Sequence, residues 1–384
     1  MHPIHVNARF LTQPRSGVQR YADALLSALD GRLASDPDLA ARIGPVTAWR
    51  PAGPARDPGW RAISLNALPG GRGHLWEQGA LWRATRRGVL LGLGNSGPLA
   101  HRRQVLALHD THLWDMPGAY TVRYRAWHRM LRPALAARAA ALLAVSDHAA
   151  TALAARLRVP RDRFALVPNA AGHLRRVAPD PDALDRAGLT RGRYLLAVGN
   201  RSPNKNLVRL LAAHGLAGDV PPLVIVGGRV PGIATSHLPG GRALSLGRVD
   251  DATLRALYEH ATGLVFPSLH EGFGIPPLEA MSLDCPVAAA RSGALPEVLG
   301  AAPIWFDPLD AKSMAGSLRA LTALTTAERT RHIRLGRARA AAYDWDSSAA
   351  TLVEILLSLR APRPARATAT RLRTAGGSHA DGAA

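Results

Sequence analysis

Two glutamates with seven residues between them stand beside a glycine-rich loop in the second half of the chain. Glu271 precedes Gly272-Phe273-Gly274, and Glu279 lies in the first turns of the helix predicted after that loop. Glycines let the backbone approach a ligand closely, and a helix N-terminus offers free N–H groups and a partial positive charge. Such a site binds anions, while the carboxylates accept hydrogen bonds from hydroxyl groups. The pattern predicts a ligand with both phosphates and a polyol, such as a nucleotide-sugar.

The same carboxylates also have purely structural explanations. Near a helix N-terminus Glu279 is a favourable charge without any ligand, and Glu271 alone could be a surface loop residue.

We expect no metal and no cofactor. The two Asp-x-Asp pairs, at residues 36–38 and 180–182, lie in proline loops outside the predicted strand ends.

The elements that must position these residues follow from the hydrophobic pattern. Short apolar runs alternate with helical patterns, which is typical of βαβ units and parallel sheets. The expected strands are Ile4–Asn7, Val89–Gly92, Val105–His109, Ala141–Ser146, Tyr194–Gly199, Leu223–Gly227, Leu244–Gly247, Leu264–Pro267, Val287–Ala290 and Ile304–Phe306. Ligands of such sheets bind beyond the carboxyl ends of the strands, and the glutamate loop directly follows one of them.

A polar, proline-containing stretch from about Val167 to Arg193 separates two series of strands. The fold class is therefore predicted as α/β, with two doubly wound Rossmann-like domains facing a central cleft. We expect one domain over residues 1–175 and a second domain over residues 190–342. A helix over 343–360 is expected to return toward the first domain, and the polar tail 361–384 to be disordered.

The chain is strongly basic, with a net charge of +20 over 384 residues, and only two of its 48 basic residues are lysines. Genome composition explains this skew as well as an anionic partner does. Nucleic acid is not expected, because the basic residues are spread out and aromatic residues make up only 5%. The segment Tyr120–Arg138 mixes aromatic residues with arginines. It fits either a face against anionic lipid or a solvated helix with its apolar stripe packed inward.

The single cysteine, Cys285, excludes an internal disulfide framework. No apolar run approaches the roughly 18 residues of a membrane-spanning helix, and no signal peptide is recognised. We expect a cytoplasmic protein, with peripheral contact at the inner face of the cell membrane left open.

Several segments together resemble the retaining glycosyltransferases of family 4, which have the GT-B fold. The resemblance implies that residues 1–175 form the acceptor-side domain and residues 190–342 the donor-binding domain. The loop with its two glutamates is similar to the signature of that family. Tyr194–Leu207 resembles its strand, loop and helix with a phosphate-binding lysine, and Gly293–Val298 resembles its Gly-x-x-Pro-Glu turn. Arg15–Ala22 is similar to its glycine-rich first loop, and Val105–Asp110 ends in a His-Asp pair like that of mannosyltransferase-type members.

The resemblance implies catalytic roles for three residues. Lys205 would meet the donor diphosphate, Glu271 would sit near the transferred sugar, and His109 would contact that sugar across the cleft. A structural alternative for His109 is a strand-end histidine bonded to the backbone. The resemblance also implies a set of donor-binding residues: Gly17, Asn200, Arg201, Lys205, Gly272, Phe273, Gly274, Ile275 and Glu279.

Within this set, Gly17 would let the first loop close over the pyrophosphate, and Glu279 would bind the ribose hydroxyls. The family often has a second basic residue where Asn200 or Asn204 stands, so Arg201 is only a substitute for it.

The implied function is transfer of a hexose from a nucleoside-diphosphate sugar, GDP-mannose being favoured, with retention of configuration. The acceptor would be a glycan or lipid-linked saccharide in bacterial cell-envelope polysaccharide synthesis. Two alternatives stay open: a nucleotide-sugar epimerase or hydrolase on the same architecture, and a non-enzymatic protein that binds nucleotides or anionic surfaces.

Overall fold

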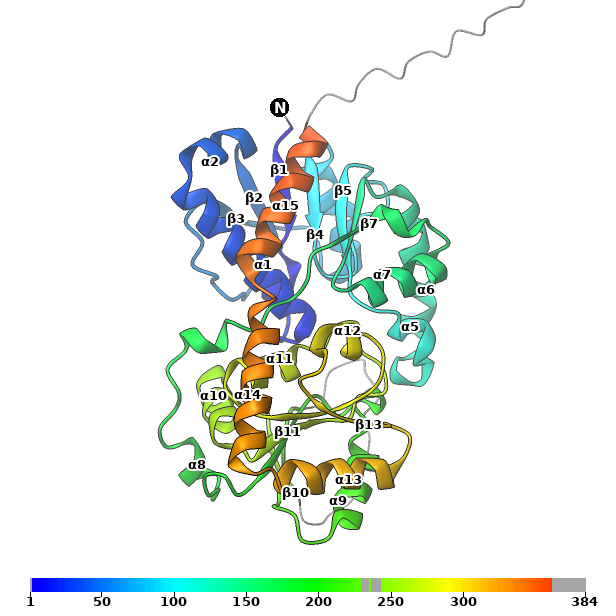
Figure 1. The fold of residues 1–384 in the computed structure, drawn as a ribbon. Coiled ribbons are helices and arrows are strands. Elements are labelled where there is room, and N and C mark those ends of the chain that lie inside the picture. Colours follow the sequence, from blue (N-terminus) through cyan, green and yellow to red (C-terminus); the bar gives the residue numbers. More distant parts are fainter. Residues whose placement is uncertain (1, 229–234, 236–242, 361–384) are drawn as a thin grey trace, which may run out of the picture.

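The computed structural model describes residues 2–228, 235 and 243–360, and they fold around two separate parallel sheets (Figure 1). The first sheet has seven strands in the order β3-β2-β1-β4-β5-β6-β7. Their bounds are Ile4–Asn7 (β1), Val46–Pro51 (β2), Ile63–Leu68 (β3), Val89–Gly92 (β4), Gln104–Leu108 (β5), Ala141–Ala144 (β6) and Phe164–Leu166 (β7). The central strands β1 and β4 are buried along their whole length, as expected where helices cover both faces of a parallel sheet.

The second sheet has six strands in the order β10-β9-β8-β11-β12-β13. Their bounds are Leu195–Val198 (β8), Leu223–Val226 (β9), Ala243–Gly247 (β10), Gly263–Phe266 (β11), Val287–Ala290 (β12) and Ile304–Phe306 (β13). In both sheets the strand order reverses once, between β1 and β4 and between β8 and β11. A crevice for ligands forms at such a reversal, beyond the carboxyl ends of the strands.

Helices flank both sheets. Those of the first half are Gly17–Ser35 (α1), Pro37–Ile43 (α2), Gly73–Trp76 (α3), Trp82–Thr85 (α4), His112–Asp115 (α5), Val122–Arg138 (α6) and Asp147–Leu157 (α7). Those of the second half are Ala183–Arg186 (α8), Leu207–Ala217 (α9), Asp251–His260 (α10), Ile275–Ser282 (α11), Leu295–Leu299 (α12), Ala311–Thr322 (α13), Thr326–Ala341 (α14) and Trp345–Arg360 (α15). The GT-B fold predicted from the sequence is thus the observed one.

The last helix, α15, leaves the second sheet and packs along α1 of the first half (Figure 1). Arg32 of α1 pairs with Asp346 at 2.8 Å, and the Ser348 hydroxyl donates to the carbonyl of Pro168 at 2.9 Å. The chain therefore crosses between its two halves twice. The predicted disordered tail, 361–384, lies outside the described residues, and the exact domain bounds stay a prediction.

Helix α6 has one buried and one exposed face. Leu131, Leu135 and Ala136 are buried, whereas Val122 is 70% and Met130 is 65% exposed. Both interpretations of this segment therefore keep support, because the inward stripe is packed and large apolar side chains remain outside. No helix among the described residues has the length and apolar character that crossing a membrane requires.

Candidate active site

The two halves of the chain enclose a cavity of about 700 Å³. Its walls come from the start of α1 and the loop after β5 on one side, and from the loops after β8, β9, β10 and β11 on the other. All of the site residues expected from the sequence line this cavity except Arg201. The residues that the motifs place far apart along the chain are thus brought together in one place.

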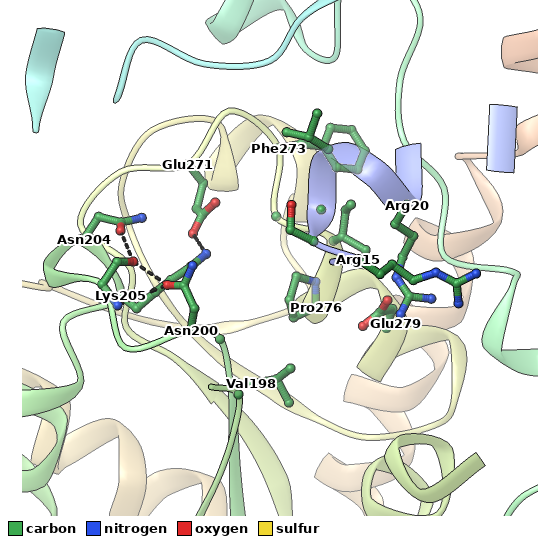
Figure 2. A pocket seen from close by; sticks show the side chains of 18 of the residues that line it. Arg15, Arg20, Val198, Asn200, Asn204, Lys205, Glu271, Phe273, Pro276 and Glu279 are labelled. Carbon is green, nitrogen blue, oxygen red and sulfur yellow. Dashed lines mark hydrogen bonds and ion pairs between the residues drawn. The ribbon is translucent and has the colours of Figure 1, made fainter. Parts of the chain in front are cut away.

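Lys205 and Glu271 form an ion pair at one end of the cavity (Figure 2). Lys205 ends a short turn after β8, and its Nζ lies 2.5 Å from Oε1 of Glu271. Burial opposes the charge on Glu271, but Lys205 and His112 outweigh it and hold the pKa of this carboxyl below its ordinary value. One fixed cation and one fixed carboxylate therefore face the same space.

Glycines shape the loop that follows Glu271. A Cβ on Gly272 would lie 2.0 Å from the carbonyl oxygen of His109, and Gly274 has a φ of +103°. A side chain at the first position would push the loop away from the end of β5, and one at the second would strain the turn into α11. Glycine at these two positions lets the loop line the cavity.

Glu279, on α11, lies apart from the ion pair (Figure 2). Its buried carboxylate accepts a 3.0 Å hydrogen bond from the Tyr258 hydroxyl and lies 3.1 Å from Nε2 of His173. Burial raises the pKa of this carboxyl, but His173 and Arg20 outweigh that effect and hold the pKa below its ordinary value. Glu279 is therefore ionised at neutral pH, and its proposed contact with ribose stays a prediction.

Arginines from the first half reach over the cavity toward α10. Arg20 pairs with Asp251 at 2.7 Å, and Arg15 pairs with the same carboxylate at 3.2 Å. Gly17 lies between them and lines the cavity near Ile275. The first loop thus spans the cleft, as the resemblance implies for a loop that covers a pyrophosphate.

His109 lines the cavity but is bonded to the backbone of its own domain. Its Nε2 donates to the carbonyl of Leu93 at 2.9 Å, and its backbone N–H donates to Asn95 at 2.9 Å. Burial lowers the pKa of the ring, so it is neutral at pH 7. The backbone-bonded alternative describes this geometry, and it leaves Nδ1 as the nitrogen that a sugar could contact.

Asn200 and Arg201, which follow β8 near the place of the family's second basic residue, lie differently with respect to the cavity. Asn200 lines the cavity, and its amide oxygen accepts from the backbone N–H of Ser202 at 3.1 Å. Arg201 does not line the cavity, because its guanidinium donates to the Ser245 hydroxyl at 2.8 Å. In this structure Lys205 is therefore the cavity-lining cation supplied by the β8 loop.

Contacts between the halves hold the cleft in this arrangement. The Ser146 hydroxyl donates to the carbonyl of Gly272 at 2.7 Å. The Glu297 carboxylate accepts from the backbone N–H groups of Asp147 and His148, both at 2.8 Å, at the start of α7. The Gly-x-x-Pro-Glu turn of one domain thus caps a helix of the other.

The motifs left several cavity residues unassigned. Arg20 and Asp251 lie on helices whose sequences show only ordinary amphipathic patterns. One signal was available for Asp251, since it follows the strand β10 and the cavity lies beyond strand ends. Glu297 stood within a recognised turn, but nothing in one sequence indicates that it contacts the other domain.

Residues 185–338 match the family described as "Glycosyl transferases group 1". The match covers most of the second half of the chain. Among curated relatives, the chain is 30% identical to O-antigen chain mannosyltransferase B of Escherichia coli over 57% of the chain and 62% of the relative. It is 26% identical to O-antigen chain mannosyltransferase RfbU of Salmonella typhimurium over 66% of the chain and 72% of the relative.

The fold of the chain is also that of solved structures. Sucrose-phosphate synthase from Thermosynechococcus elongatus superposes with a TM-score of 0.70 at 18% identity, covering 94% of this chain and 99% of that one. At this identity the likeness concerns the fold alone, and it spans both sheets. The aligned stretch covers less than two thirds of the first curated relative, mannosyltransferase B.

Proposed function

We propose that this protein is a glycosyltransferase that moves a hexose from a nucleoside-diphosphate sugar to a glycan or lipid-linked saccharide, with retention of configuration. The observation that carries the proposal is the arrangement of Lys205, Glu271 and Glu279 along one cavity between two domains. A cation beside a carboxylate suits the junction of diphosphate and sugar. A second carboxylate farther along suits the hydroxyls of a ribose.

The chemistry follows from the charges that such a reaction develops. As the sugar leaves, its anomeric carbon becomes positive and the departing phosphate oxygen becomes negative. Lys205 is the group placed to stabilise that oxygen, and Glu271 is placed to face the sugar. Because Lys205 is paired with Glu271 before the donor binds, the diphosphate must share or replace the carboxylate as the partner of its ammonium group.

Mannose is the sugar we propose for the donor, with GDP as its nucleotide. The support is that relatives along much of the chain are named O-antigen mannosyltransferases. The same names support an acceptor in cell-envelope polysaccharide synthesis.

We also propose that the enzyme is cytoplasmic and that the outer face of α6 makes peripheral contact with an anionic membrane. Val122 and Met130 are exposed there, beside the exposed arginines Arg123 and Arg129. Apolar side chains ringed by cations bind anionic lipid surfaces. Vesicles of phosphatidylglycerol should sediment the enzyme, whereas phosphatidylcholine vesicles should not.

We propose that no metal takes part in the reaction. The two Asp-x-Asp pairs have other duties: Asp36 caps α2 through the N–H of Leu39, and Asp180 pairs with Arg186. Neither pair lines the cavity. Activity should survive chelation, and turnover that is lost in EDTA and restored by manganese or magnesium would contradict this assignment.

The decisive experiment is incubation with a panel of nucleotide-sugars, with and without a membrane extract that supplies acceptors. Release of nucleoside diphosphate that depends on the extract supports transfer. Release without any acceptor indicates a hydrolase, and conversion of the donor into another nucleotide-sugar indicates an epimerase. Binding without turnover would leave the non-enzymatic alternative.

A further inference from the structure

Arg132 is a buried cation without a partner in the first domain. It lies on α6, its side chain is 3% exposed, and its Nε and Nη1 atoms have no hydrogen-bond partner among the described residues. Its favourable contact is with the face of Trp114, whose ring centre lies 5.9 Å from the guanidinium carbon. A buried charge is costly unless it is paired, so this residue requires an explanation.

His128 lies one turn earlier on the same face of α6 and has the same property. It is 3% exposed, and both ring nitrogens lack a partner among the described residues. Burial, followed by Arg132, lowers its pKa to about 3, so the ring is neutral at pH 7. It therefore offers one N–H donor and one acceptor beside an unpaired guanidinium.

The carboxylates nearest to this pair are already occupied. Glu77 pairs with Arg9 at 3.1 Å and with His74 at 2.8 Å, and it also accepts from Asn7 and Ser96. Asp110 accepts from the backbone N–H of His112 at 3.1 Å. Neither forms an ion pair with Arg132 in the described part of the chain. The positive charge of Arg132 is thus available to an anionic group from outside the protein.

The pair lies directly behind the acceptor-side wall of the cavity. Asp110, His109 and Tyr120 line the cavity, and all three lie within electrostatic range of Arg132. The Tyr120 ring stacks on Tyr124 at 5.3 Å, and Tyr124 contacts the His128 ring at 4.2 Å. The two tyrosines therefore stand between the cavity and the unpaired groups.

We propose that Arg132 and His128 form a binding site for an anionic group of the acceptor, of the phosphate class. The proposal requires that the anionic group enter from the cavity past Tyr120, which lines it. This inference rests on the proposed function, because it names the chemistry of the acceptor that the first domain would hold. A phosphate satisfies the guanidinium by two parallel N–H contacts and accepts the free N–H of the histidine. The phosphate could belong to a lipid carrier or to a soluble phosphorylated sugar.

The test is direct binding with the donor end of the cavity filled. The full chain is saturated with GDP or UDP, whichever binds, and is titrated by calorimetry with inorganic phosphate, geranyl phosphate and geraniol. Wild type should bind both phosphates and not geraniol. Arg132→Met should weaken phosphate binding at least tenfold, and Arg132→Lys should retain most of it. Arg83→Met, which removes an exposed arginine on α4 of the same domain, should bind like wild type.

Each outcome decides a point. Geranyl phosphate bound ten times more tightly than inorganic phosphate indicates a lipid-linked acceptor, and equal binding indicates a soluble one. Failure of both phosphates to bind wild type, or undiminished binding by Arg132→Met, overturns the proposal. Without ligand, Arg132→Met should melt no lower than wild type, whereas a purely structural arginine would lower the melting temperature. If no nucleotide binds, the proposed function fails, while phosphate binding that depends on Arg132 would still stand.

Discussion

The two walls of the cavity satisfy their polar groups in different ways. On the second-domain side, Lys205 and Glu271 pair with each other, and Glu279 accepts from Tyr258. On the first-domain side, Arg132 and His128 are buried without partners among the described residues. The polar groups of the second-domain wall are paired before any ligand binds, whereas the first-domain wall keeps an unpaired positive charge behind it.

This difference also separates what motifs reveal from what they conceal. The paired groups come from two compact loop segments, where glycines and a following helix mark the site. The unpaired groups come from the middle of α6, where a histidine and an arginine four residues apart have the same spacing as a solvated face. A pattern of types and spacings detects the loops but not the buried side of a helix.

The largest effect should come from breaking the charge pair of the second-domain wall. Lys205→Ala should lower kcat by about 100-fold, roughly 2.7 kcal/mol, by analogy with deleting one preorganised donor to a developing oxyanion. Turnover at saturating donor measures it. Lys312→Ala is the matched control, because Lys312 is the other lysine of the chain and does not line the cavity.

If Lys205→Ala raised KM and left kcat unchanged, the role assigned to Lys205 in stabilising the leaving group would be wrong. It would mean that this ammonium group binds ground state and transition state equally, and the stabilisation of the leaving group would have to come from elsewhere.

Most strands could be predicted, and the exceptions have a physical cause. The strands of the second sheet match the predicted segments to within one or two residues, because each is a short buried apolar run. The strand β2 and the edge strand β3 were missed, since each mixes buried residues with half-buried or exposed ones and contains polar residues. The short strand β7 was missed beside the expected linker.

The site was predictable in part for a related reason. Residues that contact the ligand through loops carry glycines and fixed spacings, so Glu271 and Glu279 could be singled out. Contacts that depend on how two domains face each other, such as Glu297 with α7, leave no such local pattern.

Acid should destabilise the first-domain wall. His128 has a pKa of about 3 when folded against an ordinary 6.5, owing to burial and then to Arg132, His74 and Arg9, which outweigh the opposing effect of Glu77. Because the unfolded state binds the proton more readily, this contribution is fully present above pH 6.5 and is lost as pH falls toward 3. Between pH 7 and pH 5 the loss is about 2 kcal/mol.

Urea unfolding of wild type and His128→Phe at the two pH values isolates the contribution of His128. Between pH 7 and pH 5 the free energy of unfolding should fall by about 2 kcal/mol less in the variant than in wild type. Equal losses in both proteins would show that His128 already has a partner or titrates normally.

On the second-domain wall, Glu279→Gln should raise the donor KM by about tenfold and largely keep kcat. The amide can still accept from Tyr258 but loses the charge-assisted strength of the carboxylate, on the order of 1 to 2 kcal/mol. Initial rates over a range of donor concentrations separate the two constants. Abolished turnover at saturating donor would instead make Glu279 part of the chemical step.

The smallest effect should come from the contact that joins the two walls. Glu297 caps α7 of the other domain with both carboxylate oxygens, and Asp147 in the same turn is held by Arg161 at 2.6 Å. Glu297→Gln leaves one acceptor oxygen for two N–H groups and removes a negative charge from a helix N-terminus, which costs about 1 kcal/mol. We expect the cleft to open to admit the donor and to close around it. The arrangement in which Glu297 contacts α7 is then the closed form, and it should be less populated in this variant.

Since the closed form is the one that brings Gly272 against β5, weaker closure should raise the donor KM about fivefold, the same 1 kcal/mol expressed as binding. X-ray scattering should show less compaction with nucleoside diphosphate than in wild type. Glu328→Gln is the matched control, because Glu328 caps α14 within its own domain through Thr325 and should change neither quantity. If both variants compacted like wild type, the Glu297 contact would be a consequence of closure that adds nothing to its stability, and the coupling between the two walls would rest on Ser146 and Arg20 instead.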